Sequence, residues 1–278
     1  MMRARTSSLR PSALSRWLAI GAVMVACARN RPSEEDLALA AALREADAAW
    51  AARGRAGLDP VALALEEVPP ARRAVPEVRW RWVRLRIAEG LVASDRATGL
   101  RSLAAAREEG LRCLTDDSVV RSTAARAGWV SAAPLIEESR VVCAAWASLA
   151  WSRWAVAFGA AGASVDADNI GALTSRGLAA ADVDVHDVAS WAEALRLLTM
   201  GVADQDRRRG VAMLLDVVRR GDDRDDAWVR WWDAARALEP SERGAFEAPT
   251  RPPSTPEERV TAVLVAKLGA REQADGRP

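Results

Sequence analysis

The densest group of reactive side chains lies at residues 182–187, whose sequence is Asp-Val-Asp-Val-His-Asp. Carboxylate and imidazole groups are ligands for divalent metal ions, so this segment could supply a metal site. It lacks the glycine of a calcium-binding loop, however, and aspartate is also a preferred helix cap. We therefore interpret the segment as a polar loop that caps a helix beginning at residue 188, and we predict no metal site.

The acidic run at residues 222–226 has a similar explanation. Its aspartates would form a solvated turn before the next helix, where the helix dipole stabilises carboxylates. The sequence contains no phosphate-binding loop, zinc signature or nucleophile motif. We therefore predict no catalytic residue, no cofactor and no enzymatic activity.

The overall composition also favours binding or scaffolding over catalysis. The chain has 278 residues, one histidine (His186), three cysteines and a formal charge of +1. A single histidine leaves little room for imidazole-based acid–base chemistry, and a balanced charge leaves no basic field for nucleic acid. We therefore expect no nucleic-acid partner.

Cys27 is the residue with the clearest predicted chemistry. Residues 1–26 contain four arginines and then an apolar run, 17–26, that is too short to span a bilayer. The sequence Met24-Val25-Ala26-Cys27 resembles the lipobox of bacterial lipoproteins, in which the cysteine is acylated after cleavage. We predict a signal peptide over 1–26 and lipidation of Cys27. The alternative is an ordinary cleavage site followed by an incidental cysteine.

The predicted destination is the bacterial envelope. Acyl chains on Cys27 would hold the protein in membrane lipid, and residues 27–32 would form a linker. Ala28 follows the cysteine, and bacterial lipoproteins without aspartate at that position usually reach the outer membrane. We therefore expect an outer-membrane lipoprotein that faces the periplasm.

Two cysteines and three tryptophans remain open to two interpretations each. Cys113 and Cys143 would share an oxidising compartment after export, so they could form a disulfide or stay as buried thiols. Trp146, Trp151 and Trp154 are candidates for a cleft or an interface, because a buried indole N–H needs a partner. The simpler interpretation places these tryptophans in the core.

Every long segment of the mature chain is predicted to be helical, which makes the fold class all-α. Helix starts are indicated by caps at Ser33, Asp59, Asp95 and Thr255. The expected helices cover residues 33–54, 59–65, 78–87, 95–113, 137–160, 167–181, 188–203, 206–219, 226–238 and 256–270. Short turns between helices imply antiparallel neighbours. The helical domain would extend over 33–272, with a disordered tail at 273–278.

In the segment 78–87, arginines alternate with apolar residues almost as in a strand. On a helix, Val78, Trp82 and Leu85 would share one face, and the other apolar residues would occupy the opposite face. No second strand candidate exists to pair with it. We therefore predict a helix packed between two neighbours.

An aspartate followed one turn later by a glycine begins the second helix of three predicted pairs. The glycines are Gly99, Gly171 and Gly210, and each would let its partner helix approach closely. Tetratricopeptide repeats use a small residue in the same way. We predict antiparallel helix pairs stacked as an irregular superhelix of the tetratricopeptide (TPR) type. A generic helical bundle is the alternative.

The end of the chain is predicted to cap this stack. Three tryptophans at helical spacing, Trp228, Trp231 and Trp232, would form an apolar stripe that must be covered. The last helix offers a matching stripe of side chains for that purpose: Val260, Val263, Leu264 and Lys267.

Taken together, the sequence resembles the T-component (TatT) lipoproteins associated with TRAP-type solute transporters. The resemblance rests on residues 46–54, 145–155 and 207–218, followed by Phe246-Glu247 and the closing helix at 262–270. It implies a tetratricopeptide-like array that binds a periplasmic partner protein, namely a solute-binding protein, and that lines a ligand cleft. The alternatives are an envelope assembly scaffold and a small-molecule-binding carrier lipoprotein. A homo-oligomer is compatible with each of these functions.

Overall fold

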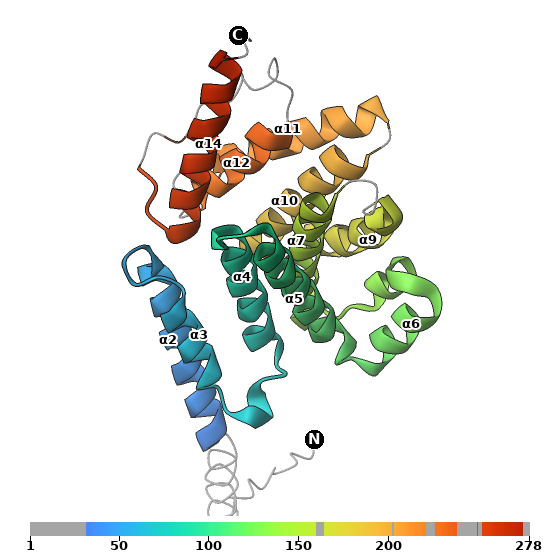
Figure 1. The fold of residues 1–278 in the computed structure, drawn as a ribbon. Coiled ribbons are helices and arrows are strands. Elements are labelled where there is room, and N and C mark those ends of the chain that lie inside the picture. Colours follow the sequence, from blue (N-terminus) through green and yellow to red (C-terminus); the bar gives the residue numbers. More distant parts are fainter. Residues whose placement is uncertain are drawn as a thin grey trace, which may run out of the picture.

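The computed structural model describes residues 32–159, 164–201, 203–220, 226–237, 249 and 252–274. All the regular elements in these ranges are helices, and they contain no strand (Figure 1). The predicted all-α fold class is therefore confirmed. Several predictions lie outside the described residues: the signal peptide, Cys27, nearly all of the linker, the acidic positions 222–225, Phe246-Glu247 and residues 275–278.

The helices follow one another with short connections. In chain order they are α2 (Glu34–Ala56), α3 (Asp59–Glu66), η1 (Pro70–Arg72), α4 (Pro76–Val92), α5 (Arg96–Thr115), α6 (Ser118–Ala132), η2 (Ala133–Leu135), η3 (Glu138–Arg140), α7 (Val141–Phe158), η4 (Ser164–Asp166), α9 (Ala167–Leu178), α10 (Val183–Met200), α11 (Asp204–Arg220), α12 (Ala227–Ala237) and α14 (Pro256–Ala274).

Side-chain caps explain where several helices begin. Ser33 and Asp36 form the predicted capping box at the start of α2, and Asp95 accepts a hydrogen bond from the Thr98 N–H at the start of α5. At the start of α14, Thr255 Oγ1 accepts from the Glu258 N–H at 3.3 Å. These helix starts agree with the predictions.

Three predicted caps are wrong. Asp59 is already inside α3, and the residue before it, Leu58, makes no side-chain cap. Asp168 lies in the first turn of α9, and Asp206 lies in α11, whose first turn is closed by hydrogen bonds to the Ala203 carbonyl. Helix α3 begins at Asp59 itself, and α9 and α11 begin before Asp168 and Asp206. Each carboxylate therefore lies inside the first turn and favours the helix through its dipole and not through a cap.

The prediction of a polar loop at residues 182–187 is also wrong. The segment is the first turn of α10 and not a loop, because Asp182 accepts hydrogen bonds from the N–H groups of Asp184 and Val185 and so begins the helix at Val183. In addition, α6 lies in a region where no helix was predicted. It contains a break at Gly128, whose φ is 76°, and the following Trp129 N–H donates to the Asn169 side chain at 3.1 Å.

Helix α4 is packed on two sides, as predicted. Val78 and Leu85 are fully buried against α2 and α3, with Trp82 beside them. Val83 and Ile87 are buried in the main core on the other side. The alternating pattern at 78–87 therefore belongs to a helix between two apolar layers.

Helix α7 lies at the centre of the fold and packs against α4, α5, α9 and α10. The segment Glu138–Phe158 is long and apolar enough to cross a membrane by length and composition, and 67% of its apolar window is buried inside the protein. This burial identifies it as the core helix around which the others are arranged.

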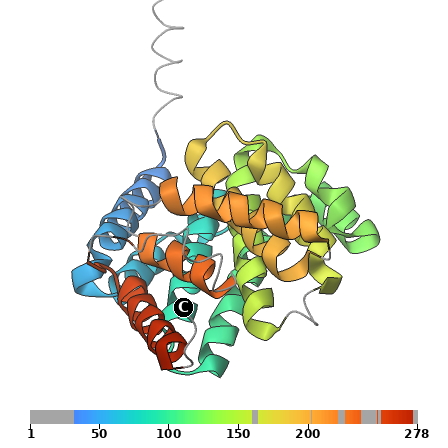
Figure 2. The same ribbon diagram turned by 90° about the horizontal axis from the view of Figure 1, so that it is seen from above.

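The two ends of the helical array meet. Helix α14 packs against α12 and α4, and its first turn reaches the end of α2 (Figures 1 and 2). Arg53 on α2 donates to Glu257 at 2.6 Å, and a Cβ on Gly54 would collide with the Ser254 carbonyl. The helices therefore form a closed arrangement, and the tetratricopeptide-like superhelix stays a prediction.

The predicted apolar cover over α12 is only partly correct. Helix α14 does pack against α12, and Trp228, Trp231 and Trp232 are half-buried. However, Val263 and Leu264 are 54% and 36% exposed, whereas the buried side chains in the described part of α14 and at its cap are polar: Thr255, Glu257, Glu258 and Thr261. Docking through the polar first turn rotates the predicted stripe away from the core. The side chain of Lys267 lies outside the described residues.

Candidate binding cleft

Four tryptophans and three arginines surround a cleft of about 370 Å³ between α4, α7 and α10. We call it the tryptophan–arginine cleft. It is lined by Trp50, Arg53, Trp80, Arg84, Val142, Trp146, Asp182, Asp184, Val185, Val188, Trp191, Asp226 and Arg230. A narrower recess of about 50 Å³ shares six of these residues and extends to Arg153 and Glu257.

Helical spacing brings these side chains to one place. Trp80 and Arg84 are four residues apart on α4, and Trp50 and Arg53 are three residues apart on α2, so each pair shares a helix face. Helices α7 and α10 supply the opposite wall, and α12 supplies the buried Arg230. The cleft therefore depends on contacts between helices that are distant in sequence.

The arginine guanidinium groups stack on the indole rings. Arg84 Cζ lies 4.0 Å from the ring centre of Trp50 and 4.9 Å from that of Trp80. Trp80 also stacks on Trp146 with 6.1 Å between ring centres. Such cation–π contacts favour a positive charge at an aromatic surface and hold the guanidinium plane in a fixed orientation.

Three of the arginines have close carboxylate partners. Arg53 lies 2.6 Å from Glu257, and Arg230 lies 2.7 Å from Asp187. Arg153, in the recess, lies 2.6 Å from Asp233. All three pairs are buried, so each carboxylate offsets a charge that water no longer screens.

Asp233 and Asp226 complete these pairs. Asp233 also accepts a hydrogen bond from the Trp191 indole N–H at 2.9 Å, and Asp226 is bonded to Arg230 at 2.9 Å. Proximity to Asp226 and Asp187, together with the hydrogen bonds they accept, raises the pKa of Arg230 even though desolvation by burial acts to lower it. The charge on this arginine is therefore well compensated.

Arg84 is different. Its nearest carboxylate oxygen, Asp47 Oδ1, is 3.4 Å from Nη2, and both oxygens of Asp47 are bonded more closely to Arg81, at 2.9 and 2.6 Å. Desolvation by burial, followed by repulsion from Arg81 and Arg53, lowers the pKa of Arg84 to about 9 despite the attraction of Asp47. Arg84 therefore carries an incompletely balanced positive charge in the wall of the cleft.

Of the three tryptophans predicted as cleft or interface residues, only Trp146 lines this cleft. Trp151 is buried in the core beside the disulfide, and its indole N–H donates to Asp166 at 2.9 Å. Trp154 stacks on Phe158 and under Arg107. The other cleft tryptophans come from separate segments, so the sequence contained no local signal that joins them.

The aspartates near His186 are used structurally. Asp182 caps α10, Asp187 pairs with Arg230 in the interior, and His186 Nδ1 lies 3.0 Å from the Leu178 carbonyl. No group of three or more histidine, cysteine, aspartate or glutamate side chains in the described part of the chain is arranged to hold a metal ion.

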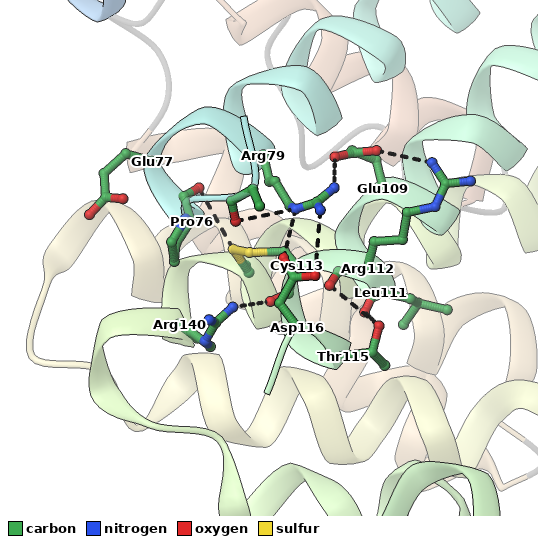
Figure 3. Close-up of a disulfide and its surroundings, with 12 residues drawn as sticks. Pro76, Glu77, Arg79, Glu109, Leu111, Arg112, Cys113, Thr115, Asp116 and Arg140 are labelled. Carbon is green, nitrogen blue, oxygen red and sulfur yellow. Dashed lines mark hydrogen bonds and ion pairs between the residues drawn. A yellow bond between two sulfur atoms is a disulfide. The ribbon is translucent and has the colours of Figure 1, made fainter. Parts of the chain in front are cut away.

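Cys113 and Cys143 form a disulfide, which settles the two interpretations left open by the sequence. The bond joins α5 to α7, with 6.1 Å between the two Cα atoms (Figure 3). Beside it, Arg79 bridges Glu109 and Asp116, at 2.6 and 2.9 Å. The disulfide thus fixes the end of α5 against the start of α7, and the ion pairs of Arg79 hold the same end of α5 against the start of α4.

The three predicted helix-contact glycines lie at different kinds of contact. A Cβ on Gly99 would lie 2.9 Å from the Gly90 carbonyl oxygen, so α4 and α5 touch backbone to backbone there. On Gly210 it would lie 2.9 Å from Leu198 Cγ. On Gly171 the nearest atom would be Nε of the Arg196 side chain, at 3.3 Å. Gly171 thus faces a flexible side chain and not a helix backbone.

Comparison with known proteins adds no family assignment. No protein-family model matches the chain, and no curated protein matches its sequence.

Proposed function

We propose that this chain is a lipid-anchored, periplasm-facing lipoprotein that acts by binding, and that the tryptophan–arginine cleft is its binding site. The observation that carries the proposal is the cleft itself: about 370 Å³ of space with four tryptophans and three arginines in its walls. Largely apolar clefts of this size with a few oriented polar groups are typical ligand sites.

Two further features support the same proposal. The lipobox-like sequence ending in Cys27 favours export and attachment to the membrane. The disulfide between Cys113 and Cys143 is compatible with an oxidising compartment such as the periplasm. In this proposal the leading partner is a solute-binding protein of a TRAP-type transporter, as the family resemblance implies.

A carrier for a small molecule is the second candidate, and the dimensions of the cleft favour it. Its volume lies at the lower end of the range of roughly 300–1,000 Å³ found for small-molecule sites. An assembly scaffold would use broad exposed surfaces instead and would not need an aromatic cleft. The partner-binding function and the carrier function both use the cleft, and they differ in the mass of the bound species, which is a protein in one and a small molecule in the other.

Site-specific photo-crosslinking tests the proposal. A photoreactive amino acid replaces Val142, which lines the cleft, in the full-length chain expressed in its native cells; the control carries it at Val130, an exposed residue of α6. We expect an adduct at position 142 and none at 130. A protein adduct supports partner binding, and a small-molecule adduct supports the carrier. No adduct at position 142 would contradict a binding function for the cleft.

A further inference from the structure

Among the described residues, Arg84 has no close carboxylate of its own. Its pKa is lowered by desolvation first and then by the charges of Arg81 and Arg53, which shows that three arginines are clustered here. In the described part of the chain, Asp47 binds Arg81 most closely and Glu257 binds Arg53. Within this part of the chain, Arg84 is therefore the arginine of the cluster that has no close carboxylate of its own.

The hydrogen-bonding capacity of Arg84 is also largely unused. A guanidinium group has five N–H donors. Among the described residues, Arg84 makes one hydrogen bond, from Nη2 to Asp47 at 3.4 Å, and its Nε is buried without an acceptor. An unsatisfied charged donor in a partly desolvated wall is costly, so an acceptor that enters the cleft would stabilise it.

The orientation of Arg84 suits an incoming oxyanion. Trp50 and Trp80 lie close to the guanidinium, at 4.0 and 4.9 Å from Cζ, and hold its plane between aromatic surfaces. A stacked guanidinium keeps its N–H donors at the edge of the plane, where an oxyanion can receive two of them. The adjoining walls include Trp146 and Trp191, which would contact the remainder of the ligand.

We infer that the tryptophan–arginine cleft binds a singly charged aromatic oxyanion, such as an aromatic carboxylate, with Arg84 as the residue that receives its charged group. This inference rests on the proposed binding function and names the ligand class for that site. The uncompensated charge and the free donors of Arg84 select an anion, and the indole walls select a planar apolar body.

The ligand carries one negative charge and not two. Arg84 supplies a single positive charge, so a second anionic group would lie in an aromatic cleft without a counterion. Asp182, Asp184 and Asp226 line the other parts of the cleft and would repel a second negative charge. Dicarboxylates and phosphate dianions should therefore bind poorly.

Calorimetric titration of the full-length chain in detergent micelles tests this inference. The probes are 1-naphthoate, its neutral isostere 1-naphthamide, succinate and inorganic phosphate, each with a matched micelle blank. The wild-type protein should bind 1-naphthoate most tightly. Arg84→Met should weaken 1-naphthoate binding about ten- to hundredfold, the loss expected for a hydrogen-bonded charge, and should leave 1-naphthamide binding unchanged.

Two further variants separate charge from fold. Arg84→Lys keeps the charge but loses the planar fork, so it should recover only part of the affinity. Arg86→Met removes an arginine on the opposite side of α4, which is paired with Glu89 and lines a separate groove, so this variant should bind 1-naphthoate as the wild type does. Thermal unfolding of each variant verifies that it is folded.

Other outcomes would overturn the inference. Equal binding of 1-naphthoate and 1-naphthamide would remove the charge selection while leaving the cleft as a binding site. Undiminished 1-naphthoate binding by Arg84→Met would exclude Arg84 as the anchor. Binding of succinate or phosphate as tight as that of 1-naphthoate would exclude the singly charged aromatic class, and so would a lack of any 1-naphthoate binding. The crosslinking experiment at Val142 tests the binding function independently.

Discussion

Arg84 stands out among the arginines of the cleft because its environment favours loss of its proton. Arg53, Arg153 and Arg230 each have a carboxylate within 2.7 Å, whereas Arg84 shares Asp47 with Arg81. Buried charges with incomplete compensation reduce stability, and natural proteins retain such residues mainly where function requires them. The unliganded protein should therefore be less stable with Arg84 than with an apolar residue of similar volume.

Replacing Arg84 with methionine should consequently stabilise the unliganded protein by about 1–4 kcal/mol. The lowered pKa of about 9 gives the effect a pH dependence. Below pH 9 the arginine is protonated in both folded and unfolded chains, so the folded state bears the full cost. Above pH 9 the folded protein releases the proton, and the advantage of Arg84→Met should shrink. Urea unfolding of the wild type and of Arg84→Met at pH 7 measures the stabilisation, and the same comparison at pH 10 measures its decrease.

The matched control is Arg81→Met. Arg81 forms the two close bonds to Asp47, at 2.9 and 2.6 Å, so its loss should destabilise the protein by about 1 kcal/mol, the pair being partly exposed. If Arg84→Met and Arg81→Met shift the urea midpoint in the same direction, it is wrong that Arg84 destabilises the folded protein while Arg81 stabilises it.

Cys27 carries the prediction of membrane attachment. The sequence contains three cysteines, and Cys113 and Cys143 are joined to each other, so Cys27 is the remaining thiol. We expect Cys27→Ser to abolish incorporation of a labelled fatty acid and to release the protein from the membrane fraction. A Cys113→Ser/Cys143→Ser double variant serves as the control and should stay labelled. Acylation of the Cys27→Ser protein would contradict the lipobox interpretation.

Helices could be predicted from sequence where a side-chain cap marks the start, as in α2 and α5, or where a two-sided apolar pattern fills the segment, as in α4. Helix α6 was missed because few of its side chains are buried: Val120 and Ala132 are the buried ones, and Gly128 interrupts it. The start of α10 was misplaced because the aspartates at 182–187 were assigned to a loop, although Asp187 is an interior ion-pair partner. Local patterns do not reveal such long-range pairing.

The cleft itself was predicted only through Trp146. Arg84 and Trp80 were visible in the alternating segment 78–87, but their meaning depends on Trp50 of α2 and on helices α7 and α10. A charge imbalance such as that at Arg84 appears only when the distances to Asp47 are known. The sequence therefore supplied the side chains, and the packing of the helices determines which of them form a site.

The contacts at Gly99 and Gly171 predict opposite effects of the same substitution. Alanine favours a helix by about 1 kcal/mol over glycine. At Gly99 the added Cβ would lie 2.9 Å from a backbone carbonyl, so Gly99→Ala should destabilise the protein by about 1–3 kcal/mol through overpacking. At Gly171 the neighbour is the movable end of Arg196, so Gly171→Ala should be neutral or stabilising. Thermal unfolding of both variants tests this prediction, and Gly99→Ala should have the lower midpoint temperature. A lower midpoint for Gly171→Ala would refute the assignment of the backbone contact between α4 and α5.

Closure of the helical array depends on contacts that no repeat pattern predicts. Helix α14 joins α12 and α4 to the end of α2 through polar side chains. The disulfide joins α5 to the central helix α7. These two links, one ionic and one covalent, connect segments that are far apart in the chain, and they should differ in how much of the fold they support.

Loss of the disulfide should weaken the fold as a unit. The bond joins residues 30 positions apart and so restricts the conformations of the unfolded chain. A Cys113→Ala/Cys143→Ala variant should therefore lose about 3–4 kcal/mol of the free energy of unfolding. Urea unfolding should show the same loss when the wild-type protein is reduced. Reductant should not affect the double variant. A variant as stable as the oxidised wild type would show that the bond contributes nothing to the native fold.

Loss of the ionic link should instead release one end of the array. Glu257 and Arg53 are both nearly fully buried and lie 2.6 Å apart, so Glu257→Lys places two positive charges together and costs about 3–5 kcal/mol if α14 stays docked. The buried side chains in the described part of α14 lie near its start, so undocking of the helix avoids that cost while α5, α7 and α10 stay packed. Hydrogen exchange should therefore rise in 256–274 and near Arg53, with α7 unchanged.

The control for this variant is Glu138→Lys, which reverses the charge in an exposed pair with Arg176 and should leave exchange in α14 as it is. An Arg53→Glu/Glu257→Lys exchange of charges should restore part of the protection, because the pair is again of opposite sign. If exchange in α14 is the same in Glu257→Lys as in the wild type, the polar first turn does not hold the helix, and its apolar neighbours on α12 must do so instead.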